Sequence, residues 1–165
     1  MNKKGFTLVE LITTFMLSSV IIILLLNVAV VIRNIYSKTN IKTDLYITQS
    51  SLSNNLNRTF GVDNISSYVE CNDSEFCYDF NLVTGDTVRL TVSDGTISFG
   101  NAKYKLNNSS KVVNPSIEKE YVTSTSEDEL DSFLVIKIPI VCDLYPGIDF
   151  GINLVYLYNS NEINL

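Results

Sequence analysis

The chain has 165 residues, with 12 lysines and arginines against 18 aspartates and glutamates, and a formal net charge of −6 at pH 7. Phosphate backbones repel so acidic a chain, and we expect no direct nucleic-acid binding. The chain contains no histidine, which excludes Ser-His-Asp and Cys-His catalytic arrangements, and it has no P-loop, dinucleotide-binding or nucleophile-elbow motif. Carboxylates such as Asp79 and Asp94 are expected to be solvated residues of strands and turns. We predict that the chain is not an enzyme.

An uncharged, mostly apolar segment covers residues 11–32. At 1.5 Å per residue its 22 residues reach about 33 Å as a helix, which is enough to cross a bilayer. Lys3 and Lys4 precede the segment, so the short leader is expected to stay in the cytoplasm while the rest of the chain faces outward. The segment is too long for a secretory signal peptide, and no A-x-A site follows it. The sequence therefore predicts a single-pass membrane protein.

The residues that lead into this segment form a specific pattern, Lys3-Lys4-Gly5-Phe6-Thr7-Leu8-Val9-Glu10-Leu11. The pattern resembles the processing site of the type IV prepilin and pseudopilin family, and the resemblance covers residues 1–32. It implies that a prepilin peptidase cuts between Gly5 and Phe6 and that the new amino group of Phe6 is methylated. It also implies that Glu10 pairs with the charged amino terminus of a neighbouring pilin or pseudopilin subunit. A membrane assembly platform and, indirectly, a motor ATPase are the further partners implied.

Elementary chemistry agrees with these implied roles. A glycine at position 5 leaves the backbone open to close approach by an enzyme. Glu10 follows Phe6 by four residues, about one helical turn, so a cation at the end of an adjacent chain can neutralise it. An ionised acid costs about 2.5–3.5 kcal/mol at the centre of a membrane helix. Glu10 lies nearer the end, where the cost is lower, but it still calls for a partner.

One residue departs from the pattern of the family. Asn27 stands where major pilins usually carry a proline, which favours a minor pilin or a pseudopilin. Retractable pili, secretion pseudopili and the DNA-uptake pseudopilus of competent bacteria share this amino terminus. The sequence leaves the choice among these systems open.

A plain membrane anchor explains the same apolar segment without a filament. In that alternative the outer domain is a surface binding module, and Tyr145-Pro146-Gly147, Tyr156 and Tyr158 are candidates for its binding face. The same tyrosines are explained more simply as aromatic residues of strands. Only Gly5 and Glu10 separate the filament subunit from the plain anchor. The filament subunit is preferred, because an anchor has no need of an acid just inside its apolar run.

The helical pattern continues beyond the apolar segment. Arg33 and Lys38 mark the outer membrane boundary. Apolar residues then recur at steps of three, four or seven, which indicates one buried face of an amphipathic helix: Ile41, Leu45, Leu52, Leu56 and Phe60. Gly61 is expected to end the helix as a C-terminal cap. We therefore predict a single helix up to residue 60, about 80 Å long at the standard rise.

After Gly61 the pattern changes to the two-residue alternation of half-buried strands. Strands are predicted at 75–82, 87–92, 96–99, 102–106, around Tyr121, at 133–142 and at 150–158. Asp94-Gly95 is a hairpin signal, and Pro139 places its strand at a sheet edge or at a bulge. The predicted fold class is α+β. A long N-terminal helix, apolar in its first half and amphipathic in its second, packs on a C-terminal antiparallel β-sheet meander.

These elements give four predicted parts. They are a leader peptide at 1–5, a transmembrane or filament-core helix at 6–32, its amphipathic extension at 33–60 and an extracytoplasmic β-rich domain at 61–165. The resemblance implies that the protein resides first in the cell membrane, with its globular domain outside, and later in an extracellular filament.

Three cysteines lie in the predicted outer domain, namely Cys71, Cys77 and Cys142. Outside the membrane a disulfide is permitted, and Cys71–Cys77 is the first choice. Closing so short a loop stabilises the fold by roughly 2–3 kcal/mol on the chain-entropy model. A bridge from either residue to Cys142, or no bridge at all, stays open. Without histidine or a C-x-x-C pair, the common zinc spacings are missing.

An acidic run provides the candidate metal site, with Glu127, Asp128, Glu129 and Asp131. Clustered carboxylates suit hard cations, and some major pseudopilins hold calcium in a loop near the C-terminal part of the fold. The run lacks the alternating Asp/Asn/Gly order of well-defined calcium loops. A solvated acidic loop is therefore preferred, and we expect no cofactor, with weak calcium binding as the alternative.

Overall fold

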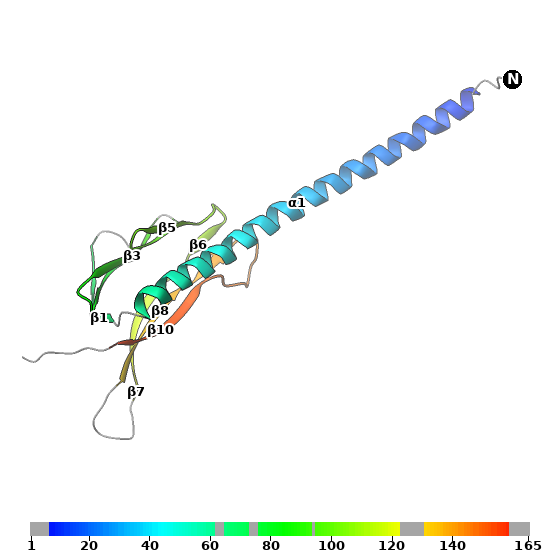
Figure 1. Cartoon of the computed structure of the whole chain (residues 1–165). Helices are drawn as coiled ribbons and strands as arrows, with labels where there is room; N and C mark the ends of the chain where they lie inside the picture. The colour runs from blue at the N-terminus through cyan, green and yellow to red at the C-terminus, as the bar shows by residue number, and fades with distance from the viewer. Residues whose placement is uncertain (1–6, 62–64, 73–75, 94, 123–130, 159–165) are drawn as a thin grey trace, which may run out of the picture. The chain divides into compact units, whose positions relative to one another are not determined.

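The computed structural model describes residues 7–61, 65–72, 76–93, 95–122 and 131–158 (Figure 1). It contains one helix, α1 (Leu8–Phe60), followed by ten strands in the described part of the chain. The chain divides into two compact units, residues 1–42 and residues 43–165. The second unit combines the carboxyl-terminal part of α1 with all of these strands.

Helix α1 continues without interruption for 53 residues, as the periodicity predicted. No proline occurs before Pro115, so nothing removes a hydrogen-bond donor from the helix interior. The Gly61 amide donates to the Asn57 carbonyl at 2.8 Å. Gly61 does not adopt the left-handed conformation of the expected cap. A Cβ at this position would instead collide with the Asn57 carbonyl oxygen, and this collision is the structural reason for the glycine.

The strands form one eight-stranded sheet and one two-stranded sheet. The large sheet has the order β5-β4-β3-β2-β1-β10-β8-β7, and the small sheet pairs β6 with β9. The bounds are β1 (Ile65–Glu70), β2 (Phe76–Leu82), β3 (Thr87–Ser93), β4 (Thr96–Phe99), β5 (Ala102–Lys105), β6 (Ser110–Val112), β7 (Ser116–Val122), β8 (Asp131–Ile138), β9 (Ile140–Cys142) and β10 (Ile152–Tyr158).

The α+β class is confirmed, with a sheet that is mostly antiparallel. Strands β2 to β5 form the predicted meander, and β1 extends it on the other side of β2. The exception to the antiparallel pattern lies at the centre, where β1 and β10 run parallel and are in register at Ile65 and Tyr158. Antiparallel groups on either side, β5 to β1 and β10 to β7, therefore meet at one short seam.

The prediction for the strand around Pro139 was wrong. One strand at 133–142, at a sheet edge or with a bulge, was expected, but β8 lies inside the large sheet between β10 and β7, and β9 belongs to the small sheet. Pro139 separates them, because a proline cannot donate a ladder hydrogen bond. Its carbonyl accepts from the Val113 amide at 3.0 Å. The sequence patterns also failed to predict β1 and β6.

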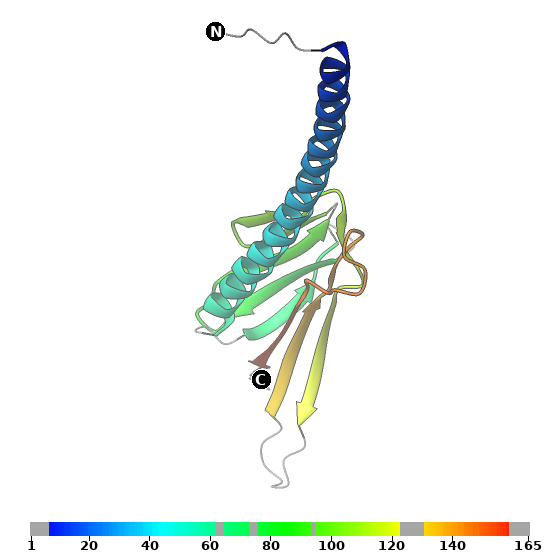
Figure 2. The ribbon, with the colours of Figure 1, turned by 90° about the vertical axis from the view of Figure 1, so that its right-hand side faces the viewer.

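The core of the second unit lies between one face of the large sheet and the last turns of α1 (Figure 2). The predicted stripe Leu45, Leu52, Leu56 and Phe60 is buried, whereas Ile41 is only half-buried. The Phe60 ring lies 4.9 Å from the Phe80 ring and 5.3 Å from the Phe99 ring, measured between centroids. It also packs edge-on against Tyr156, whose hydroxyl donates to the Asn57 side chain at 2.9 Å. Burial raises the pKa of the Tyr156 phenol.

Phe60 should therefore be essential to the second unit. Phe60→Ala removes three ring contacts and leaves a cavity, which should lower the free energy of unfolding by about 3–5 kcal/mol. Chemical denaturation of the full chain in detergent, followed by circular dichroism of the strands, measures the loss. Leu157→Ala is the matched control, since Leu157 is 57% exposed on the same sheet and should change stability little. Equal stability of the two variants would contradict this role for Phe60.

Candidate functional site

The apolar part of α1 lies mainly in the first unit. Side chains from Thr7 to Asn40 are all exposed, including the large apolar ones. The helix is long and apolar enough here to cross a membrane, which makes it compatible with a single-pass anchor. A helix that is apolar all round needs lipid or other apolar helices as its surroundings.

Three hydroxyl side chains inside this segment donate hydrogen bonds to carbonyls of the helix itself. Thr13 Oγ1 donates to the Val9 carbonyl at 3.0 Å, Thr14 Oγ1 to the Glu10 carbonyl at 2.6 Å and Ser19 Oγ to the Met16 carbonyl at 2.7 Å. Such bonds to preceding carbonyls let serine and threonine enter an apolar environment without an unpaired donor. These three hydroxyls are therefore compatible with a membrane or filament-core location.

Glu10 has local partners in the first turn of α1. The Thr7 amide donates to Glu10 Oε2 at 3.0 Å, and Thr7 Oγ1 donates to the same oxygen at 3.0 Å. In return, the Glu10 amide approaches Thr7 Oγ1 at 3.4 Å. This reciprocal arrangement is a capping box, in which a threonine at the N-cap and a glutamate three residues later satisfy each other's amides. The carboxylate also lies where the helix dipole favours negative charge.

The capping box gives Glu10 a structural reason to be present that was not predicted from the sequence. The signal was available as the spacing Thr7-x-x-Glu10 directly before an apolar run. An acid near the start of an anchor helix thus does not by itself require a second subunit. The other residues of the predicted processing site, Lys3, Lys4, Gly5 and Phe6, lie outside the described residues.

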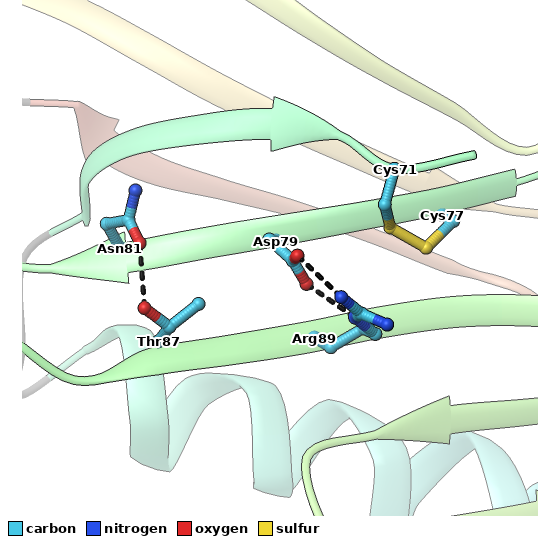
Figure 3. Close-up of polar contacts among 6 residues, drawn as sticks. All are labelled: Cys71, Cys77, Asp79, Asn81, Thr87 and Arg89. Carbon is cyan, nitrogen blue, oxygen red and sulfur yellow. Dashed lines mark hydrogen bonds and ion pairs between the residues drawn. A yellow bond between two sulfur atoms is a disulfide. The ribbon is translucent and has the colours of Figure 1, made fainter. Parts of the chain in front are cut away.

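The structure joins Cys71 and Cys77 in a disulfide, the pairing that the sequence analysis placed first (Figure 3). The Cys71 amide also donates to the Cys77 carbonyl at 3.0 Å. The disulfide and this hydrogen bond together connect the end of β1 to the start of β2. Cys142 is a buried free thiol at the end of β9. Its burial keeps the thiol away from solvent.

Asp79 has an ion-pair partner on the next strand (Figure 3). Arg89 donates to it through Nε at 2.7 Å and through Nη2 at 2.8 Å. These charge-assisted bonds hold the pKa of the Asp79 carboxyl below its usual range. Beside them, Thr87 donates to the Asn81 side chain at 2.8 Å. Asp79 is thus a cross-strand partner of Arg89 on the sheet surface, and Asp94 lies outside the described residues.

The acidic run is mostly outside the described residues, which is where Glu127, Asp128 and Glu129 fall. Asp131 begins β8. Among the residues that the structure does describe, no group of three or more cysteines, aspartates and glutamates is placed to hold a metal ion. The calcium hypothesis therefore gains no support from the described ranges.

The structure separates the tyrosines that were candidates for a binding face. Tyr156 is buried at 8% exposure beneath α1. Tyr145 packs against Phe150, with ring centroids 6.2 Å apart, beside the exposed turn at Pro146 and Gly147. Tyr158 is partly exposed on β10. These residues do not form one surface.

Comparison of the chain with protein-family models, with curated protein sequences and with solved structures finds no match.

The capping box predicts a difference between two substitutions of Glu10. Glu10→Gln keeps an oxygen acceptor for the Thr7 amide, whereas Glu10→Ala removes it. Hydrogen exchange of the first-turn amides, measured by mass spectrometry on the full chain in detergent, should be close to wild type in the glutamine variant and faster in the alanine variant. Thr7→Ala should also accelerate exchange, since loss of an N-cap side chain costs about 0.5–2 kcal/mol. Unchanged exchange in Glu10→Ala would contradict the capping role.

Proposed function

We propose that the protein is a minor pilin or pseudopilin, a structural subunit of a type IV filament system. The observation that carries the proposal is the run from Lys3 to Glu10 directly before an apolar helix. In this proposal a prepilin peptidase cuts after Gly5, the amino group of Phe6 is methylated, and the apolar helix passes from the membrane into the filament core. The filament serves pilus assembly, secretion or DNA uptake.

The exposed apolar surface of α1 supports this proposal. No other apolar side chains of the described chain pack against this surface. Neighbouring helices in a filament core can bury it as completely as lipid can. The internal bonds of Thr13, Thr14 and Ser19 suit both surroundings. These three hydroxyls can therefore keep their hydrogen bonds when the helix exchanges lipid neighbours for protein neighbours.

Glu10 can serve both as a cap and as a docking residue. Both bonds from Thr7 end on Oε2. Oε1 of the same carboxylate accepts no hydrogen bond from the described residues, so it can receive a cationic amino terminus while the cap persists. The cap also fixes the direction of the carboxylate before a neighbour arrives, which lowers the entropy cost of docking. Thr7 keeps its amide after cleavage at Gly5, because Phe6 becomes the new first residue.

The disulfide agrees with a domain outside the cytoplasm. Structural disulfides persist in oxidising surroundings and are rare in the cytosol. Cys71–Cys77 belongs to the β-rich part of the second unit, which this proposal places outside the membrane. The localisation proposed is thus a single-pass cell-membrane protein with a short cytoplasmic leader, and then an extracellular filament.

The second candidate is a single-pass anchor that displays a surface binding module. The capping box favours it, because Thr7 accounts for Glu10 without any neighbouring subunit. The two candidates differ in what must happen at Gly5 and in whether the charge of Glu10 matters.

Processing is the first test. Co-expressed with an active cognate prepilin peptidase, the chain should yield a mature protein that begins at N-methylated Phe6, as read by mass spectrometry of the intact amino terminus. Gly5→Val should block the cut, because a branched side chain obstructs the enzyme where glycine does not. An intact start near Met1 in the presence of active peptidase would favour the plain anchor.

The charge of Glu10 is the second test. Glu10→Gln keeps the cap but cannot pair with an amino-terminal cation, so it should insert into the membrane normally yet be depleted from sheared filaments on immunoblots. Thr7→Ser, which keeps the hydroxyl and the charge of Glu10, is the matched control and should be incorporated normally. Normal incorporation of Glu10→Gln would mean that capping alone explains the glutamate.

A further inference from the structure

A row of aromatic side chains lies on the sheet face that the helix covers. Phe60 ends the helix and packs on Phe80 of β2 and Tyr156 of β10. Residues two positions away on a strand point to the same face. On β10 this residue is Tyr158, and on β2 it is Tyr78, which is flanked on its own face by two buried phenylalanines.

The strand register adds two more tyrosines to this face. Tyr68 of β1 is paired with Phe80, and Tyr121 of β7 is paired with Ser132, which in turn is paired with Tyr158. Paired residues share a face of the sheet. The Tyr68 ring lies 6.2 Å from the Tyr78 ring and 5.8 Å from the Tyr158 ring. We call Tyr68, Tyr78, Tyr121 and Tyr158 the tyrosine row.

The ammonium group of Lys119 lies close to the rings of both Tyr121 and Tyr158. Its Nζ lies 4.6 Å from the centroid of the Tyr158 ring and 5.0 Å from that of Tyr121. Both distances are within the range of a cation–π interaction. At the other end, burial raises the pKa of the Tyr78 phenol, with smaller contributions from the nearby Glu70 carboxylate and from Tyr68. The row therefore carries one ammonium near one end and one carboxylate near the other.

The row is accessible, in contrast to the core beside it. Tyr121 is 61% exposed, and Tyr68, Tyr78 and Tyr158 are each partly exposed. Phe80 and Tyr156, one step closer to the helix, are buried. Aromatic contacts thus continue across β2, β1, β10 and β7 from a closed core to an open surface.

We propose that the tyrosine row binds an uncharged, unbranched oligosaccharide that lies across the strands. The faces of phenol rings offer apolar area to the C–H faces of sugar rings, and their hydroxyls both donate and accept hydrogen bonds. Tyrosine supplies this mixed surface at low cost in side-chain entropy.

The charges of the row favour a neutral ligand. Lys119 and Glu70 offset each other, while the whole chain carries a net charge of −6 and repels polyanions. The row has no aliphatic side chain to anchor an apolar peptide. This binding function is independent of filament assembly and applies equally to an anchored module.

Titration of the full chain with defined probes tests the proposal. The detergent must carry no sugar headgroup, and the probes are cellohexaose, chitohexaose, the anionic hexamer of galacturonic acid and a decaproline peptide. Binding is followed by calorimetry and by tyrosine fluorescence, which no tryptophan obscures in this chain. Tyr121→Ala and Tyr68→Ala are compared with Tyr46→Ala, a partly exposed tyrosine of α1 outside the row.

A neutral hexamer should bind the wild type and the Tyr46 variant alike. Each row substitution should weaken binding roughly threefold to tenfold, about the loss of one aromatic contact. Tyr121 is exposed, so its variant should melt like the wild type and separates loss of binding from loss of fold. The proposal is overturned if neither neutral hexamer binds, if the row variants bind as tightly as wild type, or if the anionic hexamer or decaproline binds in preference.

Discussion

The packing of the last turns of α1 on the large sheet is the interaction on which the second unit depends. Leu52, Leu56 and Phe60 are each at most 2% exposed, and they bring apolar side chains of the helix against strands from both antiparallel groups. Phe60 contacts Phe80 and Phe99 on one group and Tyr156 on the other. The two groups pair with each other through one short parallel seam, and the helix adds a second connection through the ring contacts of Phe60.

The same helix has two different requirements along its length. Its carboxyl-terminal part buries one stripe, as amphipathic helices do, while its amino-terminal part is apolar on every side and needs lipid or other helices. The capping box at Thr7 and Glu10 satisfies amides at the one end of the apolar segment where they lack helical partners. This placement makes Glu10 compatible both with an anchor and with a docking residue, and only a charge-specific substitution distinguishes the two.

The sheet face that α1 covers carries both buried and partly exposed aromatic residues. Up to Phe60 the helix covers the sheet, and Tyr156 and Phe80 are core residues. Two positions after Tyr156, Tyr158 is partly exposed on the same face, and on β2 Tyr78 is partly exposed between the buried rings of Phe76 and Phe80. The proposed binding surface therefore consists of aromatic side chains on regular strands and does not require a loop.

The sequence by itself determined the helix, its two halves, most strands and the α+β class, because these follow from periodicities within short segments. It also held the capping spacing of Thr7 and Glu10. Tertiary structure alone decided the rest. Pro139 divides two sheets instead of marking an edge, since the position of a strand depends on partners distant in sequence. Tyr156 is buried and Tyr158 is partly exposed for the same reason, because where α1 ends over β10 is a property of packing and not of local pattern.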